Sequence, residues 1–84
     1  MLLKYMLRKL SPRQQQVYDF IKEYHLQNGF SPSLADVADG VGLAVSTVAT
    51  YVKLVKAKGY ITSKEGIPRS LKIILEPEQK RNSL

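Results

Sequence analysis

Residues 33–59 read SLADVADGVGLAVSTVATYVKLVKAKG, and this stretch decides the fold because it predicts two helices joined by a tight turn. The first helix is short, since Gly40 and Gly42 both weaken it. Gly42 can supply the positive φ that a tight turn needs and that other residues resist. The second helix is longer and is expected to end at Gly59. Two helices joined by a short glycine-containing turn are the signature of a helix-turn-helix.

Each of these two helices has a candidate cap and an apolar stripe. Ser33 can cap the first helix, with Asp36 in its first turn, where the helix dipole favours an acid. Ser46 is expected to cap the second helix, which is expected over residues 47–58. The residues expected to face the core are Leu34, Val37, Ala38 and Val41 in the first helix, and Val48, Val52 and Val55, helped by Tyr51, in the second.

A further helix is predicted before this unit. Ser11 can cap it, Pro12 suits its first position, and Gln14 completes a capping box. Asn28-Gly29 is expected to end it. Its apolar stripe consists of Val17, Phe20, Ile21 and Tyr24.

After Gly59 the pattern changes from helix to strand. Residues 60–63 are β-branched and aromatic, residues 65–69 are turn residues, and residues 71–75 predict a second strand that Pro77 ends. Two strands joined by a short basic loop make a hairpin. The predicted fold class is therefore mainly α with a small β-hairpin, a winged helix-turn-helix of three helices and a two-stranded wing.

The composition excludes several classes of function. A chain of 84 residues is one domain at most and leaves no room for a large active-site cleft. Cysteine is absent, which excludes disulfides and thiol chemistry, and the single histidine, His25, is interpreted as a surface residue. The sequence has no visible nucleophile–base pair, metal-ligand cluster or dinucleotide loop. We therefore expect no enzyme activity, catalytic residue, cofactor, metal site or small-molecule ligand.

The charge of the chain points to a polyanionic partner. Thirteen Lys and Arg residues against seven Asp and Glu residues give a net charge of +6, which favours nucleic acid. Residues 40–64 contain four lysines and no acid. A solvated structural helix usually mixes signs, so this stretch suggests a face that meets phosphate. A charged surface without a partner is the alternative interpretation.

The dimensions of DNA turn this basic stretch into a predicted binding surface. The major groove is about 12 Å wide and admits one helix, and small residues at the helix start let its backbone approach base edges. Lysines further along can meet the phosphate backbone. Ser46 and Thr47 could alternatively be capping residues only. The predicted DNA-binding residues are Ser33, Ser46, Thr47, Ala49, Thr50, Lys53 and Lys56, with Lys64 and Arg69 beside the hairpin turn.

Three segments carry a resemblance to a known family. They are Leu10-Ser11-Pro12-Arg13-Gln14-Gln15, Gly29-Phe30-Ser31-Pro32-Ser33 and Lys58-Gly59-Tyr60-Ile61. On these residues the chain resembles the N-terminal DNA-binding domain of the LexA repressors over about residues 10–76. The resemblance implies a homodimer that binds palindromic operators in double-stranded DNA and represses DNA-damage-response (SOS) or phage-type operators. It also implies base reading by the first residues of the third helix, and minor-groove contact by the wing at Lys64 and Arg69.

The chain departs from the pattern of that family in three respects. The turn into the third helix is one residue shorter, and Thr and Ala replace acidic or amide base-reading residues. The operator sequence of the family therefore does not carry over. The self-cleaving Ser–Lys protease half of the family has no counterpart in these 84 residues. We expect either a fragment or a regulator without the cleavage switch.

A winged-helix adaptor that contacts protein and not DNA is the second hypothesis, because the same fold can serve unrelated functions. It predicts no binding to duplex DNA at low salt and a dependence on Leu54 or on apolar residues 1–9.

The tyrosines fit core positions, with stacking on nucleic acid as their alternative role. These tyrosines are Tyr18, Tyr24, Tyr51 and Tyr60.

The domain is predicted to cover residues 10–76, between an N-terminal extension, residues 1–9, and a polar tail, residues 77–84. The extension has apolar residues at helical spacing and is either an amphipathic arm or a poorly ordered lead-in. No apolar run approaches the roughly 18–20 residues of a membrane span, and the start lacks a signal-peptide cleavage site. A cytoplasmic protein without a membrane partner is therefore expected.

Overall fold

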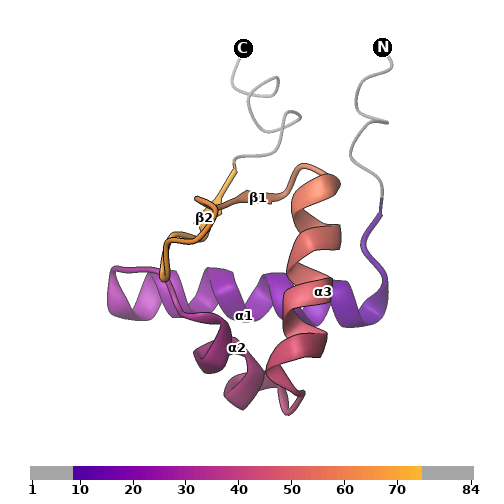
Figure 1. The fold of residues 1–84 in the computed structure, drawn as a ribbon, viewed down its shortest axis with the longest axis horizontal. Helices are drawn as coiled ribbons and strands as arrows, with labels where there is room; N and C mark the ends of the chain where they lie inside the picture. The colour runs from indigo at the N-terminus through magenta and orange to yellow at the C-terminus, as the bar shows by residue number, and fades with distance from the viewer. Residues whose placement is uncertain (1–8, 75–84) are drawn as a thin grey trace.

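The computed structural model describes residues 9–74, which form three helices and one two-stranded antiparallel sheet. Figure 1 shows α3 crossing α1, with α2 at one end of α3 and the hairpin near the other. This arrangement confirms the predicted winged helix-turn-helix class. The predicted extension and tail lie almost wholly outside the described residues. The helices and strands are α1 (Pro12–Asn28), α2 (Leu34–Val41), α3 (Val45–Ala57), β1 (Ile61–Thr62) and β2 (Lys72–Ile73).

α1 begins and ends where its local sequence predicts. The Ser11 hydroxyl accepts from the Gln14 backbone N–H at 3.2 Å, and the Gln14 side chain accepts from the Ser11 N–H at 3.1 Å, which completes the capping box. Gly29 closes the helix with φ of 78°, a conformation that favours glycine. The predicted apolar stripe is confirmed in part, because Val17 and Ile21 are fully buried whereas Phe20 and Tyr24 are half-buried.

α2 and α3 form the helix-turn-helix unit. Ser33 and Asp36 make a second capping box at the start of α2, as predicted. Gly42 ends α2 with φ of 73°, and α3 leaves the turn at an angle of 105° to α2. That angle lies within the range of about 90–120° typical of the motif. Gly40 lies against the Phe20 ring, so a side chain there would collide with α1.

The start of α3 corrects one prediction. The N-cap residue is Ala44 and not Ser46, and the helix spans Val45–Ala57 where residues 47–58 were expected. The N–H groups of Gly42 and Leu43 both donate to the Ala38 carbonyl, so the turn is complete at Leu43 and the helix starts sooner. Ser46 therefore lies inside the first turn of α3, with its side chain exposed.

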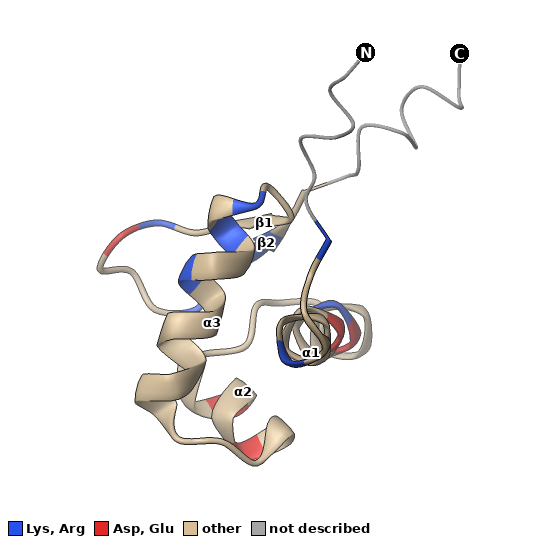
Figure 2. Ribbon diagram, turned by 90° about the vertical axis from the view of Figure 1, so that its right-hand side faces the viewer, with Lys and Arg blue, Asp and Glu red and all other residues tan. Residues whose placement is uncertain are grey.

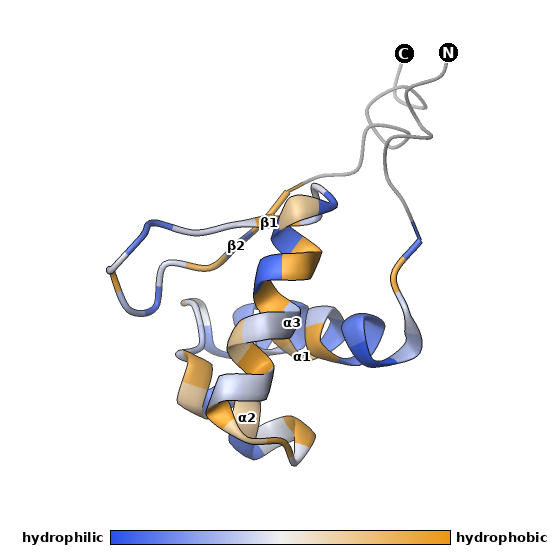
Figure 3. Cartoon of the chain, turned by 45° about the vertical axis from the view of Figure 1, so that its right-hand side comes forward, coloured by the Kyte–Doolittle hydropathy of each residue, from blue (hydrophilic) through white to orange (hydrophobic). Residues whose placement is uncertain are grey.

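The hairpin is shorter than the sequence predicts. β1 and β2 contain two residues each, where four and five were expected, and Ile61 pairs with Ile73 and Thr62 with Lys72. Residues 63–71 connect them, and we call β1, β2 and this connection the wing. Figure 3 shows the connection projecting away from the helices.

The wing is tied to α1 and to the loop after it by polar contacts. The Leu71 N–H donates to the Ser31 hydroxyl at 3.0 Å, and the Leu71 carbonyl lies 3.2 Å from His25 Nε2. His25 is half-buried, so its interpretation as a surface residue is only partly right. These bonds fix the base of the wing against the helices.

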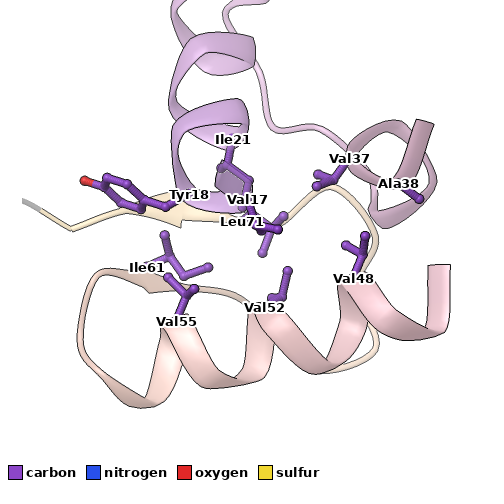
Figure 4. Packing of buried hydrophobic residues seen from close by; sticks show 10 residues of the cluster. All are labelled: Val17, Tyr18, Ile21, Val37, Ala38, Val48, Val52, Val55, Ile61 and Leu71. Carbon is purple, nitrogen blue, oxygen red and sulfur yellow. The ribbon is translucent and has the colours of Figure 1, made fainter. Parts of the chain in front are cut away.

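The core lies where the three helices and the wing meet. Figure 4 shows Tyr18, Val55 and Ile61 at one end of it and Val37, Ala38 and Val48 at the other. The predicted inward stripe of α3, residues 48, 52 and 55, is buried throughout. The full set of buried apolar side chains is Val17, Tyr18, Ile21, Val37, Ala38, Val48, Val52, Val55, Ile61 and Leu71.

Candidate nucleic-acid interface

One face of α3 is left uncovered by the rest of the domain. Ser46, Thr47, Thr50 and Lys53 are exposed, and Ala49 between them is half-buried. The Thr50 hydroxyl donates to the Ser46 carbonyl at 3.2 Å, which leaves its oxygen as an acceptor toward solvent. Because α3 contains no Asp or Glu, this face offers short hydroxyls and methyls followed by a cation.

The N-terminus of α3 differs from the other two helix starts. Within residues 9–74, α1 and α2 have capping boxes, whereas α3 has no side-chain cap. Its first N–H groups therefore depend on water or on a ligand for acceptors. Ala44, Val45, Ser46 and Thr47 are all exposed, so an anionic or hydrogen-bonding partner can reach them.

A groove of about 410 Å³ separates α3 from the wing. Its lining is largely apolar, with Ile67 at the wing tip 56 % exposed. Glu65 is the acid among the cations that line it. The predicted DNA-binding residues that line it are Ser33, Ala49, Lys53, Lys56, Lys64 and Arg69. Ser46, Thr47 and Thr50 lie outside the groove, on the exposed side of α3.

The lysines of this surface fall into two kinds. Lys53 and Lys64 are exposed, and within residues 9–74 neither ammonium group has a hydrogen-bond or ion-pair partner. The Lys56 ammonium, by contrast, donates to the Ser63 hydroxyl at 2.9 Å and joins α3 to the wing. Figure 2 shows the basic residues in the second half of α3 and in the wing, and the acids of α2 at the far end.

Lys58 does not belong to this surface. Its ammonium donates to the Gln14 side-chain oxygen at 2.6 Å and to the Lys9 carbonyl at 2.9 Å. It therefore connects the end of α3 to the start of α1.

Arg69 points back toward the helices. Its Nη1 lies 2.9 Å from Asp36 Oδ2 and 3.2 Å from the Ser31 carbonyl oxygen, to which it donates. It also donates to the Tyr24 hydroxyl at 3.4 Å, and its guanidinium lies 5.6 Å from the centre of the Phe30 ring. The sequence pattern predicts Arg69 as a DNA contact but gives no signal for any of these partners, which are distant in the sequence.

The carboxyl of Asp36 is held in its charged form. Hydrogen bonds from the Ser33 backbone, opposed by partial burial, place the pKa of Asp36 below its usual 3.8, and Arg69 lowers it further. The pKa of Arg69 is raised, first by its bond to Tyr24 and then by the Asp36 charge. The pair therefore stays ionised at neutral pH.

Other kinds of site were sought in the described part of the chain. Within residues 9–74, no group of three or more His, Asp or Glu side chains could hold a metal ion. In the same range, no single helix is long and apolar enough to cross a membrane.

Tyr18 is buried and Tyr60 packs edge-on against it, with 5.4 Å between the ring centres, as the prediction of core packing for these tyrosines requires.

These features define a class of protein. A helix-turn-helix with a wing, an exposed acid-free face on its last helix and unpaired lysines beside it is the architecture of a nucleic-acid-binding domain. The LexA DNA binding domain family matches residues 7–70 of the chain. The chain therefore belongs to that family.

Curated relatives agree with this assignment. The LexA repressor of Oceanobacillus iheyensis is 44 % identical over 75 residues, and that of Thermosipho melanesiensis is 39 % identical over 72 residues. The LexA repressor of Geobacillus sp. is 41 % identical over 69 residues. These matches cover 87 %, 86 % and 81 % of this chain and 36 %, 36 % and 33 % of the relatives. The chain thus spans about a third of the length of the relatives it matches.

Proposed function

We propose that this domain binds double-stranded DNA sequence-specifically through α3 and the wing, and acts as a transcriptional repressor. One observation carries the proposal: the uncapped, acid-free exposed face of α3 lies beside a groove whose largely apolar lining includes the exposed Lys53 and Lys64. DNA offers the base edges that such a helix can read and the phosphates that such cations can neutralise.

In this proposal the first half of α3 reads bases. Ser46, Thr47 and Thr50 present hydroxyls that can exchange hydrogen bonds with base edges, while the methyl groups of Ala49 and the threonines can contact thymine methyls. Val45, an exposed apolar residue at the start of the helix, adds a further contact that the sequence analysis missed. The expected half-site therefore includes thymine within reach of these side chains.

The lysines and Ser33 set the position of the domain on the duplex. Lys53 lies one turn beyond the base-reading residues, where the helix would leave the groove and pass a phosphate. Lys64 would reach a phosphate or the adjacent minor groove from the wing, and Ser33 would contact the backbone near the start of α2. Lys56 contributes positive charge while bonded to Ser63.

Dimer formation completes the proposed function. A single domain of this size reads one half-site, and specific affinity usually needs two half-sites about one helical turn apart. We therefore propose a homodimer on a palindromic operator. The relatives are named LexA repressors, which supports repression of DNA-damage-response or phage-type operators by a cytoplasmic protein.

Selection of bound sequences from a random duplex pool tests this proposal. We expect a palindromic motif, with an affinity whose log–log dependence on salt has a slope near about −4 to −5 if roughly five phosphates are neutralised. Lys53→Gln should weaken binding to all sequences alike and reduce the slope by about one. Lys22→Gln on α1, which removes the same charge outside the proposed surface, is the control. An empty selection, without binding even at low salt, would favour the adaptor function.

A further inference from the structure

Arg69 belongs to the wing, yet its described contacts reach three segments outside it. The guanidinium meets the Asp36 carboxylate on α2, the Ser31 carbonyl in the α1–α2 loop and the Tyr24 hydroxyl on α1. The Phe30 ring lies under it. One side chain therefore connects the wing to both helices that precede α3.

The backbone of Arg69 adopts a conformation that is unfavourable for a residue with a side chain. Its φ of 54° lies in the left-handed region, and within residues 9–74 it is the single non-glycine residue there. A residue with a Cβ atom adopts this region at an energetic cost. The contacts of the side chain offset that cost and hold the turn in place.

Asp36 couples this contact to the recognition unit. Its Oδ2 atom accepts from the Ser33 N–H at 3.0 Å and is also the atom that meets Arg69 at 2.9 Å. The same carboxylate oxygen thus caps α2 and binds the wing. A displacement of Arg69 therefore perturbs the start of the helix that sets the position of α3.

We infer that Arg69 is a positioning residue, which fixes the direction of the wing relative to α2 and α3 through Asp36, and not a phosphate contact. The inference rests on the proposed DNA-binding function and deepens it. All three polar contacts of Arg69 use Nη1, and one of them is to a carboxylate at ion-pair distance. The charge of Arg69 is therefore already compensated within the protein and attracts a phosphate less than an unpaired lysine does. Lys64 lines the groove beside α3 and has no such partner among residues 9–74, so it is the phosphate contact of the wing on that side.

Two charge-matched substitutions on α2 separate positioning from simple electrostatics. Asp36→Asn keeps the size of the side chain and an oxygen that can accept from Ser33, but removes the ion pair. Asp39→Asn removes the same charge from an exposed side chain of the same helix. If only the net charge of the domain mattered, each variant would bind DNA at least as tightly as the unchanged chain, because each loses a negative charge.

The positioning role predicts opposite results for the two variants. With the duplex enriched by the selection above, Asp36→Asn should bind about two- to fivefold more weakly, while Asp39→Asn should bind as tightly as the unchanged chain or better. Binding of Asp36→Asn as tight as that of Asp39→Asn would overturn the inference. Failure of the unchanged chain to bind any duplex would instead overturn the proposed function.

A DNA footprinting experiment with a second variant tests the inference even if Asp36→Asn does not fold. Arg69→Asn is the second variant, because asparagine tolerates the left-handed region. We expect loss of the minor-groove protection due to the wing, with the major-groove protection due to α3 retained. A variant that keeps the wing protection, or loses both protections in proportion, would overturn the inference. Adding Asp36→Asn to Arg69→Asn should cause little further loss, and additive losses would also overturn it.

Discussion

α1 and α3 are both amphipathic helices packed across one another, but they use their polar groups differently. α1 satisfies its N-terminus with a capping box, and its exposed side chains bond one another, as in Gln15 to Asp19 at 3.0 Å. α3 starts at the uncapped Ala44 and carries no acid. α1 therefore uses its polar groups within the protein, while α3, the helix proposed to bind DNA, leaves them available.

The difference lies in N-terminal capping, which α1 has and α3 lacks. Two of the three described helices follow the capping rule, and the one that departs from it is the proposed recognition helix. Such departures are expected at functional sites, because a group satisfied within the protein cannot also bind a ligand. Substitutions in α1 and α3 test this contrast.

Ile21→Ala tests the supporting role of α1. Ile21 is fully buried, so the truncation should lower the free energy of unfolding by about 2–5 kcal/mol. A domain this small has about 3–5 kcal/mol in total, so much of the structure should be lost. Denaturant unfolding followed by circular dichroism measures the effect. Leu26→Ala, on the same helix but 76 % exposed, should change stability by less than about 0.5 kcal/mol. Similar losses in both variants would contradict the packing described here.

Thr50→Ala tests the recognition role of α3. The side chain is exposed and lies outside the core, so stability should change little. Sequence discrimination should relax by about 1–3 kcal/mol at a single base pair. Competition between the selected duplex and its single-base variants measures this. Loss of affinity spread evenly over all sequences would show that Thr50 does not read a base.

Ala44→Asp should turn the start of α3 into one like that of α1. The new carboxylate can accept from the first-turn N–H groups, so stability should rise by about 0.5–2 kcal/mol. DNA affinity should fall, because the same groups then have an internal partner and the surface gains a negative charge. Thermal unfolding and a binding titration on one sample report both effects. Ser11→Ala on α1 is the reverse control and should lower stability by about 1 kcal/mol without changing affinity. Tighter binding by Ala44→Asp would contradict the role assigned to the uncapped N-terminus.

The stabilising contacts of the Asp36 carboxylate, first with the Ser33 backbone and then with Arg69, should weaken in acid. Because the pKa of Asp36 is lowered in the folded chain, the unfolded chain takes up this proton first as the pH falls. The stability due to Asp36 is therefore complete above 3.8 and is lost as the pH drops through that value toward the lower folded pKa. Unfolding temperatures of the unchanged chain and Asp36→Asn, measured from about pH 6 to pH 3, should differ most at the upper end and converge at the lower end. A difference independent of pH would show that the charge of Asp36 is not involved.

Features that depend on neighbouring residues were predictable from the sequence. Ser11 with Gln14, and Ser33 with Asp36, place their capping partners three residues apart, and both boxes form as expected. The spacing of Val48, Val52 and Val55 likewise identified the buried side of α3. The start of α3 was misplaced because Ser46 is a better capping residue than Ala44, so propensity alone favours the wrong position.

Features that depend on distant residues were not predictable. The partners of Lys56 and Arg69 were invisible because Ser63 is seven residues from Lys56 and Asp36 is thirty-three from Arg69. The sequence could predict that both cations lie near the recognition helix, but not that protein groups already bind them. The predicted DNA contacts remain predictions. The structure adds which of the cations already have a partner within the protein and which do not.

The chemical shifts of backbone amides during a titration with duplex DNA show directly whether α3 and the wing bind the duplex. The account predicts that the resonances that move belong to the exposed face of α3 and to the wing around Lys64, while those of the exposed side of α1 around Asp19 and Glu23 stay in place. Movement confined to α1, or no movement at low salt, would contradict it.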